Sequence, residues 1–386
     1  MSDLLAVVAP RIFDGFEWHD NAALLIEFGH VAAIVHSDAV PARSETVHLE
    51  GGFVAPGFVD LQVNGGGGVL FNNDPSLSAI RTIIAAHAQF GTTALLPTLI
   101  TDSVEINTAA IAAGKAAAEQ ALPGFLGLHL EGPHLSLPRK GTHDPALIRP
   151  MTDADLDRLV AARQVLPNLL CTVASETVDS QQISALAGAG IIVSLGHSDA
   201  THATASAAFE AGATMTTHLF NAMSQLGSRE PGVVGATLAH PTIYAGLIAD
   251  GIHVHPASIQ VALAAKGAEH IFLVTDSMSQ TGTDIAELTL NGRTITRADG
   301  ALRLADGTLA GADLDMIDAV EFMHSHMGLP LETALNMASL VPSRALGIDA
   351  QHGHLRPGAR ANFVQLSPGR EVRTTWINGK KVWSTN

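Results

Sequence analysis

The strongest constraint on the fold is a repeating unit that fills the chain between about residue 53 and residue 350. Each unit has an apolar run of about four to eight residues, a polar or glycine-containing break, and a stretch of helical character. Eight runs follow one another: FVAPGFVDLQV, TTALLPTLI, FLGLHLEG, LLCTVASE, IIVSLGHS, TMTTHLFN, IYAGLIADG and IFLVTDS. Such runs are typical of parallel strands covered on both faces. Strands alternating with helices in this number favour an α/β fold closed into a (β/α)8 barrel, although the count also suits an open, doubly wound sheet.

The segments between these runs have the features of helices. SLSAIRTIIAAHAQFG begins with a serine that can cap a helix, and Gly91 marks its end. Its apolar residues share one helical face; they are Leu77, Ile80, Ile83 and Ile84. We therefore expect this segment to pack as a helix against the strands.

Both ends of the chain consist of short β-like runs instead. Neither end has enough apolar surface for a core of its own. We expect residues 1–52 and 355–386 to form one small β-sandwich domain, beside a hydrolase barrel that spans residues 53–354. Within the barrel region, the insertion at 288–311 contains pairs that favour hairpin turns; these are Asn291-Gly292, Asp299-Gly300 and Asp306-Gly307.

Composition limits the compartment and the partners. With 47% hydrophobic and 15% charged residues, this chain of 386 residues is expected to be globular. Its 37 acidic and 21 basic residues give a net charge of −16, which opposes binding to nucleic acid or to anionic membranes. We find no signal peptide and no long apolar span. Cys171 is the only cysteine and lies in an apolar run, so we expect a buried thiol and a cytoplasmic protein.

Three residues with metal-binding side chains stand where barrel strands should end. Glu131, His197 and His218 follow the third, fifth and sixth apolar runs, whose ends meet on one face of a closed barrel. Because the chain has 19 histidines, this shared position carries more weight than the residue type. Two imidazoles and a carboxylate leave a coordination position open for water, as in catalytic zinc sites. We expect one divalent metal ion per subunit, preferably Zn²⁺.

Asp276 directly follows the apolar residues IFLVT. An ionised carboxylate is costly in such a place unless it has a partner or a chemical task. It could cap the segment that follows. We favour a general base that takes a proton from a metal-bound water and returns it to a leaving amine.

Seven motifs occur in order along nearly the whole chain: PGFVDLQVNGGGG at 56–68, HLEGPHLS at 129–136, KGTHDP at 140–145, SLGHSDA at 194–200, THLFNAM at 217–223, ADGIHV at 249–254 and LVTDSM at 273–278. The closing segment GHLRPGARANFVQL at 353–366 also fits. Together they resemble the N-acetylglucosamine-6-phosphate deacetylases, a branch of the amidohydrolase superfamily. The resemblance implies hydrolysis of N-acetyl-D-glucosamine 6-phosphate to D-glucosamine 6-phosphate and acetate, a step of amino-sugar metabolism.

The resemblance also implies roles for residues. Glu131, His197 and His218 would hold the metal, and Asp276 would be the proton donor and acceptor. Substrate contacts fall on Thr142, His143, Asn221, Ala222, Arg229, Asp250, His253, Leu309, Ala310 and Gly311. A homodimer is expected because the family uses the neighbouring subunit to complete the phosphate site. Chemistry agrees, since a donor such as His143 can stabilise an oxyanion and Arg229 with His253 can bind phosphate.

Three positions depart from the expected pattern. Many amidohydrolases have HxH at the end of the first strand, but this chain has Gln62-Val63-Asn64. Amide side chains are poor zinc ligands, so we expect a single metal ion. His134 replaces an expected aromatic residue, and Asp313 follows Ala312 where a small hydroxyl is usual. The roles of His134 and Asp313 stay open at this point.

Three other functions remain to be weighed. N-acetylgalactosamine-6-phosphate deacetylation differs at one sugar stereocentre that no motif reports. A cyclic-amide hydrolase is disfavoured because the chain lacks HxH and an evident bridging lysine. A non-catalytic scaffold is disfavoured because Glu131, His197, His218 and Asp276 are all present.

Overall fold

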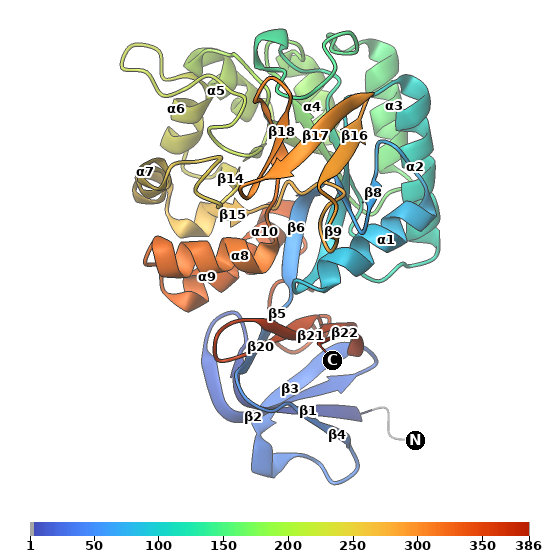
Figure 1. Cartoon of the computed structure of the whole chain (residues 1–386), viewed down its shortest axis with the longest axis vertical. Helices are drawn as coiled ribbons and strands as arrows, with labels where there is room; N and C mark the ends of the chain where they lie inside the picture. The colour runs from blue at the N-terminus through green and yellow to red at the C-terminus, as the bar shows by residue number, and fades with distance from the viewer. Residues whose placement is uncertain (1–3, 386) are drawn as a thin grey trace.

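The computed structural model describes residues 4–385 and contains a barrel above a smaller β-domain (Figure 1). The barrel strands are β6 (Phe58–Val63), β9 (Thr92–Ile100), β10 (Leu128–Glu131), β11 (Leu169–Val173), β12 (Ile192–Leu195), β13 (Met215–Thr216), β14 (Tyr244–Leu247) and β15 (Ile271–Leu273). They pair in parallel in chain order from β6 to β15. A parallel bridge between Val63 and Ser277 closes the ring. The predicted (β/α)8 barrel is confirmed.

Helices surround these strands (Figure 1). They are α1 (Leu77–Ala88), α2 (Val104–Glu119), α3 (Asp153–Arg163), α4 (Ser180–Gly188), α5 (His202–Glu210), α6 (Gly232–Ala239), α7 (Pro256–Lys266), α8 (Met316–Glu321), α9 (Leu331–Ala338) and α10 (Leu340–Leu346). The first is the helix expected from the sequence: the Ser76 side chain accepts a hydrogen bond from the Ala79 N–H, and Ile80 and Ile83 are fully buried. Among residues 4–385, no helix has the length and apolar character needed to cross a bilayer.

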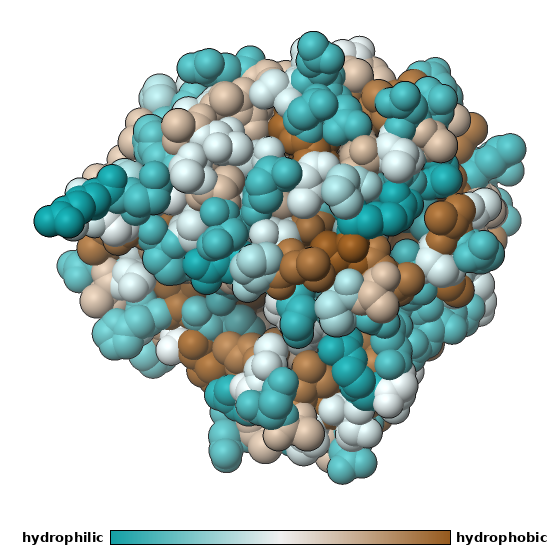
Figure 2. All heavy atoms as spheres, turned by 90° about the horizontal axis from the view of Figure 1, so that it is seen from above, coloured by the Kyte–Doolittle hydropathy of each residue, from teal (hydrophilic) through white to brown (hydrophobic). Residues whose placement is uncertain are grey.

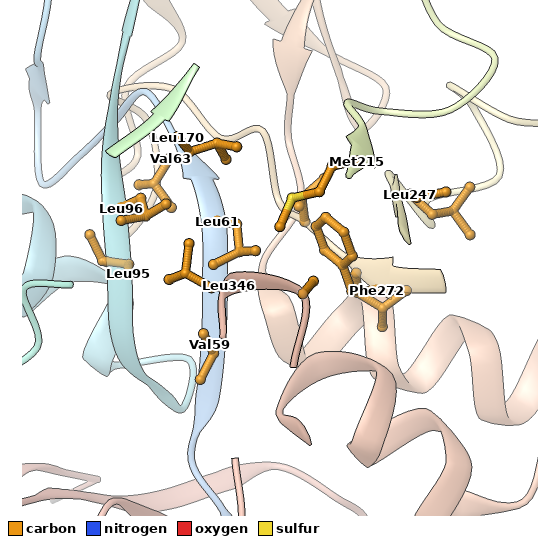
Figure 3. Packing of buried hydrophobic residues seen from close by; sticks show 14 of the residues in the cluster. Val59, Leu61, Val63, Leu95, Leu96, Leu170, Met215, Leu247, Phe272 and Leu346 are labelled. Carbon is orange, nitrogen blue, oxygen red and sulfur yellow. The ribbon is translucent and has the colours of Figure 1, made fainter. Parts of the chain in front are cut away.

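The hydrophobic core fills the barrel and the space under its helices. Figure 3 shows side chains from strands far apart in the sequence pointing toward one another, among them Leu61 of β6, Met215 of β13 and Phe272 of β15. Cys171 of β11 belongs to this core, and burial raises the pKa of its thiol to about 12. The thiol is therefore a buried apolar group, as the sequence predicted.

Both ends of the chain build the β-domain. Its strands are β1 (Leu4–Phe13), β2 (Trp18–Glu27), β3 (His30–His36), β4 (Glu45–His48), β5 (Phe53–Pro56), β20 (Phe363–Leu366), β21 (Val372–Ile377) and β22 (Lys380–Ser384). The two ends join where β5 pairs antiparallel with β20. The first apolar run is therefore divided at Gly57, with β5 in the β-domain and β6 in the barrel. We propose to place the domain boundary after Pro56, four residues later than expected.

The insertion forms a sheet of its own over the barrel. Its strands are β16 (Glu287–Leu290), β17 (Arg293–Ala298), β18 (Ala301–Leu304) and β19 (Leu309–Ala312), and a small ribbon of β7 (Gly65–Gly66) and β8 (Val69–Leu70) lies at the same end. Apolar residues of the insertion pack on Leu70, Ile100 and Met278. Figure 2 views this end of the molecule from above and shows a mixed surface with several separate hydrophobic patches.

Candidate metal centre and active site

Three metal-binding side chains meet at the carboxyl end of the barrel. Glu131 is the last residue of β10, and His197 and His218 lie two residues beyond β12 and β13. His218 Nε2 lies 3.1 Å from Glu131 Oε1 and 3.1 Å from His197 Nε2. His197 Nε2 lies 3.2 Å from the same carboxylate oxygen. All three residues are buried, so the structure brings together the three ligands predicted from the sequence.

The backbone at these strand ends is strained. His197, His218 and Asp276 have φ angles of +47°, +31° and +47°, in the left-handed region that residues other than glycine seldom adopt. Such a conformation costs about 1–3 kcal/mol per residue and is concentrated at functional sites. The strain therefore marks the same face of the barrel as the metal-binding side chains do.

Hydrogen bonds prepare the cluster to bind a cation. His197 Nδ1 lies 2.8 Å from the carbonyl oxygen of Arg139, and only a protonated Nδ1 can donate to a carbonyl. The neutral His197 ring then has its free lone pair on Nε2, which faces Glu131, as in many metal-binding histidines. Burial alone would raise the pKa of Glu131, but the imidazoles of His197 and His218 hold it well below its ordinary value.

A fourth side chain, His143, stands beside this cluster. Glu131, His143 and His197 offer ligand atoms that all lie within 4.8 Å of one another. His143 Nδ1, however, accepts a hydrogen bond from the Thr101 N–H at 3.3 Å and contacts the Thr101 hydroxyl at 2.7 Å. His218, in contrast, directly contacts both Glu131 and His197. Because Nδ1 of His143 is an acceptor, the neutral His143 ring carries its proton on Nε2.

Asp276 is held by two amides from the first barrel strand. Asn64 Nδ2 donates to Asp276 Oδ1 at 2.8 Å, and Gln62 Nε2 donates to the same oxygen at 3.1 Å. Gln62 Nε2 also lies 3.4 Å from both carboxylate oxygens of Glu131. Burial, together with the charge of Glu131, raises the pKa of Asp276 to about 6. From the sequence, Gln62 and Asn64 were predicted only to be poor metal ligands, and their role as donors to Asp276 was missed.

A cavity of about 510 Å³ lies above these groups. It is lined by Glu131, His197, His218 and Asp276, and by these other predicted residues: Thr142, His143, Asn221, Ala222, His253, Leu309 and Gly311. Asp250 lies behind His253, whose Nδ1 is 2.6 Å from Asp250 Oδ2. Ala310 is buried in the core of the insertion. Arg229 is exposed and does not line the cavity of its own chain.

The cavity also has two cationic residues that the sequence analysis did not select. Arg139 precedes the KGTHDP motif, and Arg303 lies on β18 of the insertion. No local pattern marks either of them, because each reaches the cavity only through the long-range fold. Another cavity, of about 490 Å³, lies between the barrel and the β-domain and contains none of the metal-binding side chains described above.

The two residues with open roles lie outside the cavity. His134 Nδ1 is 3.1 Å from the carbonyl oxygen of Arg149, and its Nε2 is 4.0 Å from Asp155. Asp313 accepts a hydrogen bond from Arg297 Nε at 2.8 Å. Both residues therefore make contacts within the protein and do not line the cavity.

The model of the amidohydrolase family matches residues 53–382. The chain belongs to the amidohydrolase family. Amidohydrolases of this kind are metal-dependent, and the buried carboxylate and imidazoles suit a divalent cation.

Related proteins cover this amidohydrolase nearly from end to end. It is 44% identical to an N-acetylgalactosamine-6-phosphate deacetylase of Shewanella sp. (strain ANA-3), over 94% of this chain and 92% of the relative. It is 36% identical to an N-acetylglucosamine-6-phosphate deacetylase of Haemophilus influenzae, over 99% of both chains. The crystal structure of N-acetylglucosamine-6-phosphate deacetylase from Pasteurella multocida superposes with a TM-score of 0.95, at 35% identity over 99% of this chain and 100% of that chain.

Proposed function

We propose that this amidohydrolase removes the acetyl group of N-acetyl-D-glucosamine 6-phosphate, releasing acetate and D-glucosamine 6-phosphate. The observation that carries the proposal is the buried cluster of Glu131, His197 and His218, joined to Asp276 through Gln62, at the base of a cavity of about 510 Å³. Similarity over 99% of the chain to the Haemophilus influenzae deacetylase supports the choice of substrate.

Glu131, His197 and His218 would hold one divalent ion, which we propose to be Zn²⁺. Bound there, it would lower the pKa of a water molecule and polarise the acetyl carbonyl group. One ion is preferred to two because Gln62 and Asn64 direct their amide N–H groups to carboxylates, where they act as donors and not as ligands.

Asp276 is proposed as the general base and acid. Both amide donors bind Oδ1, so Oδ2 is the oxygen that can take a proton from water and return it to the departing amine. His143 is proposed to assist at the carbonyl. Burial, with the neighbouring His197, holds the pKa of His143 well below its ordinary value, so the neutral ring can donate from Nε2 to the oxygen that gains negative charge.

The remaining predicted residues are proposed to bind the sugar phosphate. Thr142, Asn221, Ala222, His253, Leu309 and Gly311 line the cavity, with Asp250 and Ala310 behind them. We propose a homodimer in which Arg229 serves the neighbouring subunit, since it is exposed and absent from the cavity of its own chain. A cytoplasmic location is proposed from the single buried thiol of Cys171.

The galacto epimer of the substrate is the second candidate. It is favoured by one specific observation: the Shewanella relative, at 44% identity, is an N-acetylgalactosamine-6-phosphate deacetylase. Comparing kcat/KM for the two epimers on one metal-loaded preparation distinguishes the candidates. A higher value for the galacto sugar would replace our proposed substrate and leave the reaction class unchanged.

Acetate release from N-acetylglucosamine 6-phosphate is the primary test. Metal content is measured first, and a chelated sample and a metal-restored sample are assayed in parallel. We expect turnover to disappear on chelation and to return with about one equivalent of metal per chain. A fully metallated protein that releases no acetate from either epimer would refute the proposed function.

A further inference from the structure

The insertion sheet forms a fixed wall of the cavity. Its last strand, β19, is attached to the tip of the eighth barrel strand, because the Ala312 N–H donates to the Asp276 carbonyl at 2.9 Å and Ala312 forms a parallel bridge with Ser277. At Gly311, an added Cβ would lie 2.8 Å from the same carbonyl oxygen. The outer part of β19 and its neighbour β18 therefore extend from the candidate base toward the mouth of the cavity.

Arg303 occupies this outer position. It is paired in register with Leu309 of β19, and both residues line the cavity. Leu309 stands two strand residues from Gly311, which corresponds to about 7 Å along the strand. Arg303 therefore lies farther along the sheet from the base than Gly311 does, and it is exposed.

The guanidinium of Arg303 has no acidic partner among residues 4–385. Its Nη1 donates a hydrogen bond to the Gly307 carbonyl at 3.2 Å. The other arginine that lines the cavity is already paired, since Arg139 Nε lies 2.7 Å from Asp199. His253 also has a carboxylate partner, because its Nδ1 lies 2.6 Å from Asp250. In a protein with a net charge of −16, an unpaired arginine at the mouth of a cleft is suited to an anion.

The chemistry of the substrate places its anion at the same end. In a hexosamine 6-phosphate the reactive amide is on C2, and C5, which carries the phosphorylated C6, lies across the ring from C2. When the amide is at Glu131 and Asp276, the phosphate must therefore point toward the opening of the cavity. There it meets Arg303 of its own chain, whereas Arg229 is exposed and does not line this cavity.

We propose that Arg303 binds the 6-phosphate and thereby makes the enzyme select phosphorylated over unphosphorylated N-acetylhexosamines. This inference rests on the proposed function, and it concerns substrate choice and not the chemical step. Arg303 is accordingly a specificity-determining residue supplied by the insertion.

The test compares kcat/KM of wild-type, Arg303→Ala and Arg303→Lys enzymes on N-acetylglucosamine 6-phosphate and on N-acetylglucosamine. We expect R303A to lower kcat/KM for the phosphate ester about 10- to 100-fold, mainly through KM, as expected for a lost hydrogen bond to a charged group. Activity on the unphosphorylated sugar should be unchanged, and R303K should restore part of the preference. If R303A left kcat/KM unchanged for both substrates, or lowered kcat/KM equally for both, the proposal would be overturned.

Arg297→Ala is the matched control, because Arg297 lies in the same sheet but binds outside the cavity, to Asp313 and to the Thr283 carbonyl. If the R297A substitution disturbs the sheet, it should lower kcat/KM equally for the phosphorylated and the unphosphorylated sugar. Arg229→Ala tests the rival: loss of the phosphate preference in R229A alone, with R303A unchanged, would assign the phosphate to the partner subunit. Binding of inorganic phosphate, measured by calorimetry, should weaken in R303A even if wild-type enzyme hydrolyses neither sugar, so failure of the proposed function is distinguishable from failure of this inference.

Discussion

At the residue scale, the buried carboxylate of Glu131 and the partly buried carboxylate of Asp276, joined through Gln62, have opposite electrostatic environments. Two imidazoles contact Glu131 and hold its pKa well below its ordinary value, whereas burial raises the pKa of Asp276 to about 6. Two carboxylates whose pKa values are separated in this way commonly have different roles in one active site. Glu131 can remain ionised as a ligand, while Asp276 can exchange a proton near neutral pH.

Asp276→Asn tests this division. The amide can keep an oxygen toward Asn64, but it cannot take up a proton. We expect kcat to fall about 10²- to 10⁴-fold, the usual contribution of general acid–base catalysis, with metal content unchanged. Single-turnover acetate release and metal analysis of the same sample measure both quantities. Undiminished turnover in D276N would remove Asp276 from the mechanism.

Another carboxylate, the buried Asp60, should make the free energy of unfolding depend on pH. It is fully buried, and burial raises its pKa from 3.8 to about 7 although the Thr275 hydroxyl donates to it at 2.6 Å. The folded protein thus keeps this proton to a higher pH than the unfolded chain does. The stabilising effect is complete below about pH 4 and is lost as the pH rises through about 7.

Asp60→Asn removes this titration and retains an oxygen for the Thr275 hydroxyl. We expect the free energy of unfolding of D60N to decline less between about pH 4 and pH 7 than that of wild-type protein. The interval between the two pKa values corresponds to about 4 kcal/mol as an upper limit. Urea unfolding at a series of pH values measures the slope; equal slopes in the two proteins would show that another group is responsible.

At the scale of elements, the hairpin turns of the insertion could be predicted from the sequence, but the position of its sheet beside the cavity could not. Asn291-Gly292 and Asp299-Gly300 have positive φ angles and join β16 to β17 and β17 to β18, as hairpin turns of this kind require. Local sequence decides such turns. That the sheet then reaches the cavity depends on contacts with Leu70 and Ile100, far away in the chain, which no local pattern reveals.

The insertion also reaches the loop that carries His143. Arg293, the first residue of β17, donates from Nη2 to the carbonyl of Thr142, next to His143. We expect Arg293→Ala to lower kcat about 10-fold by loosening this loop, with metal content unchanged. Arg293→Gln, which keeps a donor, should recover part of the loss.

Hydrogen exchange of the loop at residues 137–145 supplies a readout that separates loop mobility from general instability. Exchange should accelerate in R293A and stay at the wild-type rate in R297A, because Arg297 does not contact this loop. Wild-type kcat and wild-type exchange in R293A would show that the hydrogen bond to Thr142 does not position His143.

The same contrast between local and long-range information explains which other features of the fold and the site could be predicted from the sequence. The eight barrel strands and the convergence of Glu131, His197 and His218 followed from apolar runs and from the rule that parallel strands end on one face. The split of the first run at Gly57 was missed, because both halves are equally apolar and only the pairing of β5 with β20 separates them. The donor role of Gln62 was missed because its acceptors are 69 and 214 residues away.

At the scale of the whole molecule, we expect metal binding to stabilise the folded protein but not to be required for folding. The core consists of large apolar clusters in both domains, so the fold does not depend on the small group around Glu131. An ion that binds only the folded state stabilises it by mass action. We expect chelation to lower Tm by about 5 °C while the far-ultraviolet circular dichroism stays unchanged.

Glu131→Ala is the control for this measurement, since its Tm should not respond to the chelator. Addition of Zn²⁺ after chelation should restore the wild-type Tm. Collapse of the circular dichroism signal on chelation would instead show that the metal is required for folding.

The described chain starts in β1 and finishes in β22, and both strands belong to the β-domain, at the end of the molecule opposite the insertion (Figure 1). An affinity tag or a solid support attached beside β1 or β22 would therefore lie next to the β-domain and away from the cavity. Immobilised through the β-domain, every molecule would present its open face to the surrounding solution.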